Sequence, residues 1–196
     1  VIARPLTQCG GNRMPVSITA YYGAQLFGVT ARVGSHWRLS CDQCMTKSYI
    51  NDELYFIWSK GDGSQHYFRK PNSSAAYYED LSGLSLKLTD NGTYTEIEDK
   101  GGTVMRFESP QDALDDTGRL LSITDSCGNT NTFQYGDWRL ERITDGAGRV
   151  TQFTYSGNML TGILAPGETA PVTLEYYNNM RLNGIVDADG CLLYTS

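Results

Sequence analysis

The chain has 196 residues, of which 40% are hydrophobic, and its 21 glycines and 13 tyrosines fit a turn-rich all-β protein. A net charge of −6 with scattered lysines and arginines argues against binding of nucleic acid, which needs a basic stripe facing the phosphate backbone. No apolar run approaches the roughly eighteen residues that span a membrane, so we expect no membrane span in this segment.

The N-terminal part of the chain predicts strands without a clear repeat. Residues 15–22 alternate enough for one strand, and residues 34–40 predict another after a Gly-rich stretch. Residues 54–69 predict a hairpin with its turn at Gly61-Asp62-Gly63. Residues 81–88 place alternate leucines on one face, which is the pattern of a half-buried strand.

Residues 94–107 predict a second hairpin, which already carries the pattern that dominates the rest of the chain. Four of its residues have the offsets that recur later: Ile97, Asp99, Gly102 and Phe107. Residues 109–116 are acidic and the least strand-like, and we expect one short helical turn there. The array therefore begins in degenerate form before Leu120.

From Leu120 onwards the chain repeats itself about every twenty residues. Leucines spaced 20, 20 and 22 residues apart are each followed three residues later by isoleucine: Leu120, Leu140, Leu160 and Leu182, with Ile123, Ile143, Ile163 and Ile185. A fixed period of this size marks an array whose units are too small to bury their own apolar faces. We therefore expect the function to belong to the assembled surface rather than to a catalytic cluster.

Each unit predicts a β-hairpin. Its turn has Asp at the first position and Gly at the fourth, the preference of a type I turn, except that Ala165 and Pro166-Gly167 replace this pattern in the third unit. Aromatic residues two apart in the second strand share a face. The anchors of the two best-formed units are Leu120, Ile123, Asp125, Gly128, Phe133 and Tyr135, then Leu140, Ile143, Asp145, Gly148, Phe153 and Tyr155.

One spacing leaves two alternatives open. Leu140 and Ile143 are three residues apart, so a flat strand would point them to opposite faces. Either the strand contains a bulge or both of its faces are partly covered.

The pattern divides the chain into three parts. Residues 1–117 form a β-rich leading segment with degenerate repeats, and residues 118–190 form the clear repeats. Residues 191–196 match the translation of a transposon-end adapter used to prepare sequencing libraries, so we expect them to be an artefact of read-through. Because the chain begins at Val1 and stops within a unit, we expect a fragment of a longer protein.

The repeats resemble those of the Rhs, or YD-repeat, family. The strongest matches are Gly118 to Asp125 and Ile143 to Thr151. The closing Tyr-Asp of that repeat is displaced by one residue in Tyr135-Gly136-Asp137 and is missing after Tyr155. Three upstream segments also resemble the part that leads into the array in secreted members: Met14 to Tyr21, Trp37 to Leu39, and Asp62 to Phe68.

The resemblance implies a function without chemistry on a substrate. Members of the family are very large bacterial surface or secreted proteins whose repeats wind into a hollow β-sheet shell around a variable C-terminal toxin. It implies an array of antiparallel β-hairpins forming part of a curled shell, with the remaining repeats and the toxin domain of the same chain as partners. The family's self-cleavage residues follow the last repeats, so no catalytic residue carries over.

Residues that could carry chemistry have simpler explanations. His36 and His66 stand beside aromatic residues in predicted strands, which favours a strand position over a general base. Cys41 and Cys44 have the spacing of half a zinc site, but no second pair completes it, so they are weak metal candidates. The recurring aspartates could suggest calcium, but turn chemistry explains them. We expect no cofactor.

The alternative function is a cell-surface adhesion or glycan-binding array. The aromatic pairs could offer a platform for sugar stacking, and residues 155–162 faintly resemble cell-wall choline-binding repeats. Those repeats need a Trp-Tyr-Tyr cage in every unit, whereas only Trp138 falls within this array. Packing between neighbouring hairpins is the favoured explanation of the aromatic pairs, because an isolated hairpin is unstable. A cell-surface glycan remains the alternative partner.

Overall fold

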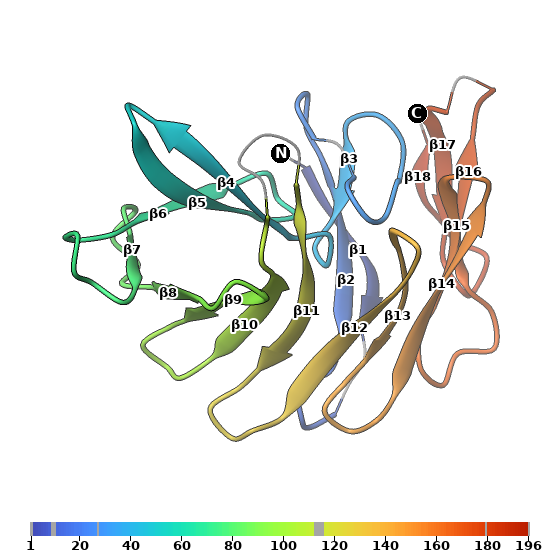
Figure 1. The fold of residues 1–196 in the computed structure, drawn as a ribbon. Helices are drawn as coiled ribbons and strands as arrows, with labels where there is room; N and C mark the ends of the chain where they lie inside the picture. The colour runs from blue at the N-terminus through green and yellow to red at the C-terminus, as the bar shows by residue number, and fades with distance from the viewer. Residues whose placement is uncertain (1, 9–10, 27, 112–115, 179, 196) are drawn as a thin grey trace. The chain divides into compact units, whose positions relative to one another are not determined.

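A computed structural model of the chain describes residues 2–8, 11–26, 28–111, 116–178 and 180–195 (Figure 1). Within these residues all regular secondary structure is β-strand, so the predicted all-β class with antiparallel hairpins is confirmed. The strands are β1 (Ile2–Gln8), β2 (Ser17–Tyr22), β3 (Trp37–Leu39), β4 (Cys44–Ile50), β5 (Glu53–Ser59), β6 (Gln65–Arg69), β7 (Tyr78–Asp80), β8 (Lys87–Asp90), β9 (Tyr94–Glu98), β10 (Val104–Glu108), β11 (Gly118–Thr124), β12 (Thr130–Gly136), β13 (Arg139–Thr144), β14 (Val150–Ser156), β15 (Met159–Leu164), β16 (Val172–Tyr176), β17 (Leu182–Val186) and β18 (Leu192–Thr195).

The strands belong to two compact units. One, the sandwich unit, comprises residues 1–42, 61–63 and 131–196, and the other, the barrel unit, comprises residues 43–60 and 64–130. None of the described segments is a helix of the length and apolarity that crossing a membrane requires. The boundaries predicted at residues 117 and 190 mark where the clear repeats begin and end. They do not describe compact units, and they stay a prediction.

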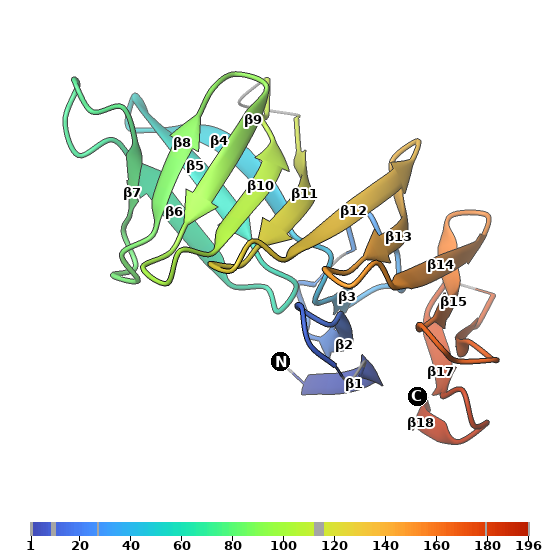
Figure 2. The same cartoon turned by 90° about the horizontal axis from the view of Figure 1, so that it is seen from below.

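The barrel unit is a closed antiparallel barrel of strands β4 to β11 (Figure 2). Each strand pairs with its neighbour in the chain from β4 to β10, and β11 closes the ring by pairing with both β10 and β4. An eight-stranded barrel is just narrow enough for side chains to fill it. The completely or almost completely buried apolar side chains are Met45, Phe56, Phe68, Leu88, Ile97, Phe107 and Leu120.

The predicted strand over residues 81–88 is wrong for its first part. Strand β8 begins only at Lys87, and Leu84 is 55% exposed. Positive φ angles of 82° at Gly83 and 56° at Ser85 break the extended backbone, while the Asp80 carboxylate accepts a hydrogen bond from the amide of Leu84 at 2.9 Å. The short helical turn expected within residues 109–116 depends on residues 112–115, which lie outside the described residues.

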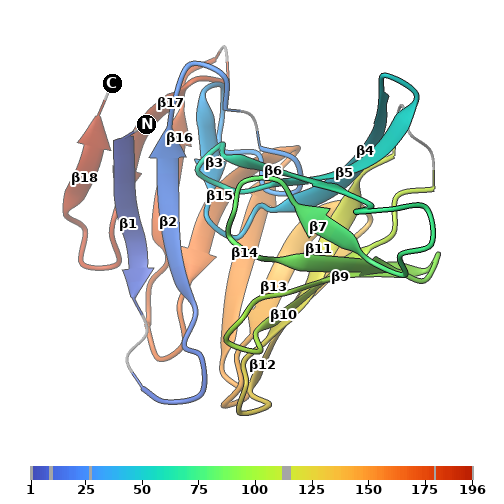
Figure 3. The ribbon, with the colours of Figure 1, turned by 90° about the vertical axis from the view of Figure 1, so that its left-hand side faces the viewer.

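The sandwich unit has two layers. Strands β12 to β18 form an antiparallel meander, and β1, β2 and β3 form a second sheet, which Figure 3 shows in front of β14 to β17. The ring of Trp37 on β3 lies 4.9 Å from that of Tyr194 on β18. Strand β18 lies within residues 191–196, which were expected to be an artefact, and it pairs with β17.

A bulge recurs at the same place in every repeat. Tyr135 pairs with Leu140 while Gln134 pairs with Arg142, so Glu141 is an extra residue in β13. The equivalent extra residues are Leu121, Thr161 and Asn183. An extra residue resets the alternation of side chains, so Leu140 and Ile143 face the same way and both are buried. The bulge is therefore the correct one of the two alternatives.

The predicted Asp turns form. The amide of Gly148 donates to the carbonyl of Asp145 at 2.9 Å, and Oδ1 of Asp145 accepts the amides of Ala147 and Arg149, both at 2.9 Å. The same turn occurs at Asp99, Asp125 and Asp187. Ala165 closes its turn through the backbone alone, with its carbonyl accepting the amide of Glu168 at 3.2 Å. The side chain therefore adds bonds to a turn that the backbone can also make without it.

Candidate functional site

The most developed polar site lies in the sandwich unit, where residues 28–34 cross the repeats; we call this segment the strap. The amide of Leu140 donates to the carbonyl of Thr30 at 3.0 Å, and the amide of Leu160 donates to the carbonyl of Arg32 at 2.9 Å. Each leucine directly precedes the extra residue of the bulge in its hairpin, Glu141 or Thr161. The strap therefore supplies one carbonyl to each of two successive bulges.

Tyrosines satisfy the carbonyls of the same two bulges. The hydroxyl of Tyr155 donates to the carbonyl of Leu140 at 2.7 Å, and that of Tyr176 donates to the carbonyl of Leu160 at 2.6 Å. Burial raises the pKa of both phenols well above the ordinary value, so both remain donors at neutral pH. These two tyrosines, at the ends of β14 and β16, thus bond to the preceding bulge as well as packing in the sheet.

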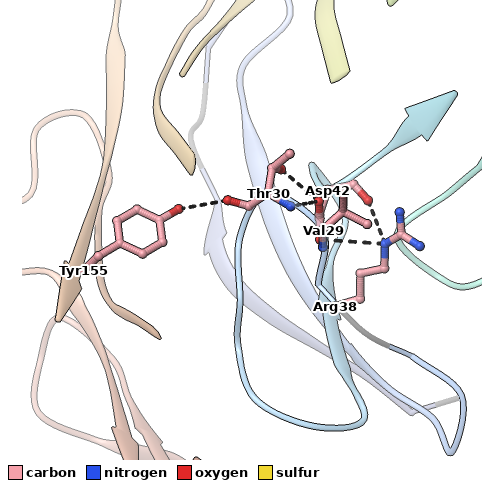
Figure 4. A network of polar contacts seen from close by, with 5 residues as sticks. All are labelled: Val29, Thr30, Arg38, Asp42 and Tyr155. Carbon is pink, nitrogen blue, oxygen red and sulfur yellow. Dashed lines mark hydrogen bonds and ion pairs between the residues drawn. The ribbon is translucent and has the colours of Figure 1, made fainter. Parts of the chain in front are cut away.

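A buried carboxylate holds the strap in place (Figure 4). Asp42 is fully buried; its Oδ2 accepts the amide of Val29 at 2.7 Å, and its Oδ1 accepts the amide and the hydroxyl of Thr30 at 2.9 and 2.8 Å. On the far side of Thr30, the Tyr155 hydroxyl lies 3.5 Å from the Thr30 carbonyl. Thr30 is therefore fixed from both sides.

Arg38 completes the network. Its Nε donates to the carbonyl of Asp42 at 2.8 Å and lies 3.8 Å from Oδ2 of the same residue. Burial raises the pKa of Asp42, and it outweighs the opposing effects of Arg38 and of the three donors from Val29 and Thr30. With both carboxylate oxygens engaged, Asp42 is a clamp rather than a general base.

The structure describes both weak metal candidates, Cys41 and Cys44. Cys41 and Cys44 are both buried, and burial raises the pKa of the Cys41 thiol, which keeps it protonated and a poor nucleophile. In the described part of the chain, no group of three or more His, Cys, Asp or Glu side chains is placed to hold a metal ion. Cys9 lies outside the described residues.

The barrel unit brings together Ser82, His66 and Asp80, which sequence reasoning missed. His66 Nδ1 lies 2.8 Å from the hydroxyl of Ser82, which donates to Asp80 at 2.6 Å. A hydrolytic triad needs histidine between serine and aspartate, whereas here serine lies between the other two. This cluster therefore lacks the order that would activate a nucleophile.

His66 lies in β6, as predicted. His36 precedes β3 and has a φ of 71°, so its predicted strand position is wrong.

The repeat anchors separate into a core set and a turn set. The buried members are Leu120, Phe133, Leu140, Ile143 and Phe153, and the half-buried ones are Ile123, Tyr135 and Tyr155. The turn members are Asp125, Gly128, Asp145 and Gly148. The strap and its clamp were missed because Asp42, Thr30 and Arg38 stand outside the period and match no motif.

A scan against models of protein families gives no match, and a search of curated proteins gives none either.

Proposed function

We propose that this chain is a non-enzymatic structural segment of a secreted or cell-surface protein of the Rhs type, in which the hairpins form part of a shell that encloses a C-terminal toxin. The observation that carries the proposal is the bulge that recurs at one offset in successive hairpins. Each unit presents its leucine and isoleucine to the same side, so each added unit continues the same sheet. A repeat built this way suits a wall better than a single binding site.

Containment would be the mechanism of such a wall. Successive hairpins pair edge to edge, the sheet curls, and the enclosed polypeptide is kept from the cell and from solvent until delivery. Curling also protects strand edges, which would otherwise offer unpaired backbone groups to other chains. The bulges favour the curl, because a bulged strand bends and twists more strongly than a regular one.

The alternative, a glycan-binding array, is less well supported. The hydroxyl of Tyr155 is used by the carbonyl of Leu140, and the guanidinium carbon of Arg139 lies 5.3 Å from the ring centroid of Tyr155. The guanidinium carbon of Arg32 lies over the ring of Trp138, 5.0 Å from its centroid. Sugar stacking needs an open aromatic face, and these two rings are already covered by cations.

Extending the array tests its open-ended character. A copy of residues 149–157 followed by a copy of residues 138–157 is placed after Gly190 instead of residues 191–196, because Gly190 is equivalent to Gly148 and residue 149 continues the repeat in phase. A matched control carries the same residues in scrambled order. We expect slow amide hydrogen exchange in the added copies and fast exchange in the scrambled ones, because only the repeat can pair with the meander. Equal exchange in the two proteins would contradict the proposal.

The contents of the shell need a separate experiment on the parent gene, read to its natural stop codon. In the purified parent protein, the polypeptide that follows the repeats should resist protease until the repeats are denatured. Cleavage of that polypeptide at low protease concentration, with the repeats intact, would contradict containment while leaving the array itself untouched.

A further inference from the structure

One end of the meander in the sandwich unit carries apolar side chains in its turns. The turns that join β12 to β13, β14 to β15 and β16 to β17 lie at the same end, because antiparallel strands alternate in direction (Figure 1). Trp138 and Met180 in two of these turns are 36% and 63% exposed, and Met159 directly follows the third. The other two tryptophans, Trp37 and Trp58, are buried. This end, which we call the turn face, therefore exposes apolar groups that could have been buried.

Two arginines flank the exposed indole. The guanidinium carbons of Arg32 and Arg139 lie 5.0 and 5.9 Å from the ring centroid of Trp138. Across the described residues, neither arginine has a carboxylate within ion-pair distance. In a chain with a net charge of −6, two like charges gathered on one ring without a counter-ion form a local positive site. Such a site attracts an anionic group.

A groove bordered by Arg32 is lined in part by two methionines. It encloses about 280 Å³ and is bordered by Gly28, Arg32, Gly34, Ser35, Met159 and Met180. Gly34 has a φ of 99°, and a Cβ atom there would lie 3.0 Å from the carbonyl oxygen of Met180, so the strap approaches the turn closely. Methionine side chains are flexible and polarisable, and they adapt to the shape of an aliphatic side chain.

We propose that the turn face binds an acidic polypeptide segment. Its carboxylates pair with Arg32 and Arg139, and a neighbouring aliphatic side chain occupies the groove between Met159 and Met180. A sulfated glycan would share the anionic chemistry, but it gains most from an open aromatic face, and the Trp138 ring is covered by guanidinium groups. This proposal does not depend on whether the repeats form a shell.

The test uses the full chain and a fluorescently labelled peptide that alternates glutamate and leucine. A matched peptide has glutamine in place of glutamate, and a heparin fragment serves as the sulfated glycan. Binding is measured by fluorescence anisotropy at low and physiological salt. The change in tryptophan emission on binding gives a second readout, which reports mainly on Trp138 because Trp37 and Trp58 are buried. The variants are Arg32→Gln, Arg139→Gln and Met180→Ser, with Arg4→Gln on β1 as an exposed control of equal charge change.

We expect the acidic peptide to bind and the glutamine peptide to bind at least tenfold more weakly. Arg32→Gln and Arg139→Gln should each weaken binding about tenfold, as expected for loss of a charge-assisted contact. Met180→Ser should weaken binding several-fold without changing its salt dependence, and Arg4→Gln should have no effect. Arg139 also donates to the carbonyl of Gly157, so Arg139→Gln can lower the melting temperature. In that case the result for Arg32→Gln alone decides whether the proposal holds.

Three results would each overturn the proposal. The first is no saturable binding of the acidic peptide. The second is equal binding by Arg32→Gln and the unmodified chain. The third is tight binding of the heparin fragment without binding of the peptide, which would assign the turn face to a sulfated glycan.

Discussion

Replacing Asp42 by alanine should destabilise the sandwich unit by about 3–5 kcal/mol, because it removes the clamp of the strap. The amides of Val29 and Thr30 and the hydroxyl of Thr30 would lose their acceptor. An unsatisfied buried donor costs about 1–3 kcal/mol, and Thr30 is only 2% exposed. Arg38, 8% exposed, would lose its nearby carboxylate as well. Because a domain has about 5–15 kcal/mol of stability, this loss is large.

Urea denaturation of the full chain measures this loss. Circular dichroism follows both units, and tryptophan fluorescence in a Trp58→Phe background follows the sandwich unit, which holds both Trp37 and Trp138. Thr30→Val removes only the hydroxyl bond and should cost about 1 kcal/mol. Asp189→Ala is the control, since Asp189 is exposed in a turn and should change stability by no more than about 0.5 kcal/mol. A loss below about 1 kcal/mol for Asp42→Ala would refute the clamp.

The pH dependence gives the Asp42 prediction a second readout. Because burial raises the pKa of Asp42 above that in the unfolded chain, the folded state binds this proton more tightly. The contribution of Asp42 to stability should therefore be greatest below the ordinary carboxyl pKa and fall as pH rises through the raised pKa. Asp42→Asn should remove that fall. The difference in unfolding free energy between the unmodified chain and Asp42→Asn should therefore shrink with rising pH. A difference that grows with pH would contradict the sign.

Three further predictions concern the repeats. Asp145→Asn should cost about 1–2 kcal/mol of unfolding free energy at pH 7, measured by urea denaturation. Despite burial, which opposes it, hydrogen bonds from amides and from Arg149 lower the pKa of Asp145 in the folded state. The cost should therefore be present above the ordinary carboxyl pKa of 3.8 and disappear as pH falls through the lowered pKa, which urea denaturation at each pH measures. Tyr155→Phe should cost about 1–2 kcal/mol by urea denaturation, because the buried carbonyl of Leu140 loses its donor, and no change would show that the 2.7 Å bond contributes nothing. Deletion of Glu141 should abolish cooperative melting of the sandwich unit, because Ile143 would turn out of the core, whereas Glu141→Ala should change stability by no more than about 0.5 kcal/mol.

The hairpins of the repeat could be predicted because their determinants are local. Asp and Gly three residues apart specify the turn, and an aromatic pair two residues apart specifies the second strand. The hairpin over residues 94–107 followed from the Asp and Gly rule, and the one over residues 54–69 followed from its Gly61-Asp62-Gly63 turn; they form as β9 with β10 and as β5 with β6. The bulge was open to question because the spacing of Leu140 and Ile143 fits two arrangements equally well.

The closure of the barrel could not be predicted because it depends on distant residues. Strand β4 was not expected at all, and its pairing of Met45 with Gly118 joins residues far apart in the chain. A local pattern records which face of a strand is buried, but not which strand lies beside it. The linear array expected from the period therefore describes β12 to β18, whereas β4 to β11 form a ring.

The site was harder to predict than the fold because its groups are mainly backbone atoms. The carbonyls of Thr30 and Arg32 accept bonds irrespective of the side chains that they carry. The tyrosines were predicted as packing residues, and their hydroxyl bonds add a function that the aromatic spacing does not reveal. Asp42 has its partners thirteen and twelve residues away in an irregular segment, where no period applies.

The bulge explains why the repeats need a segment from outside the array. Each bulge leaves an amide and a carbonyl without their regular strand partners, and buried groups of this kind must be satisfied. The carbonyls of Leu140 and Leu160 are satisfied by tyrosines within the array, but their amides bond to the strap. Releasing the strap through Asp42→Ala should therefore speed hydrogen exchange at the amides of Leu140 and Leu160, while amides in the barrel unit keep their protection. Exchange that rises equally in both units would show that Asp42 stabilises the chain by some route other than the strap.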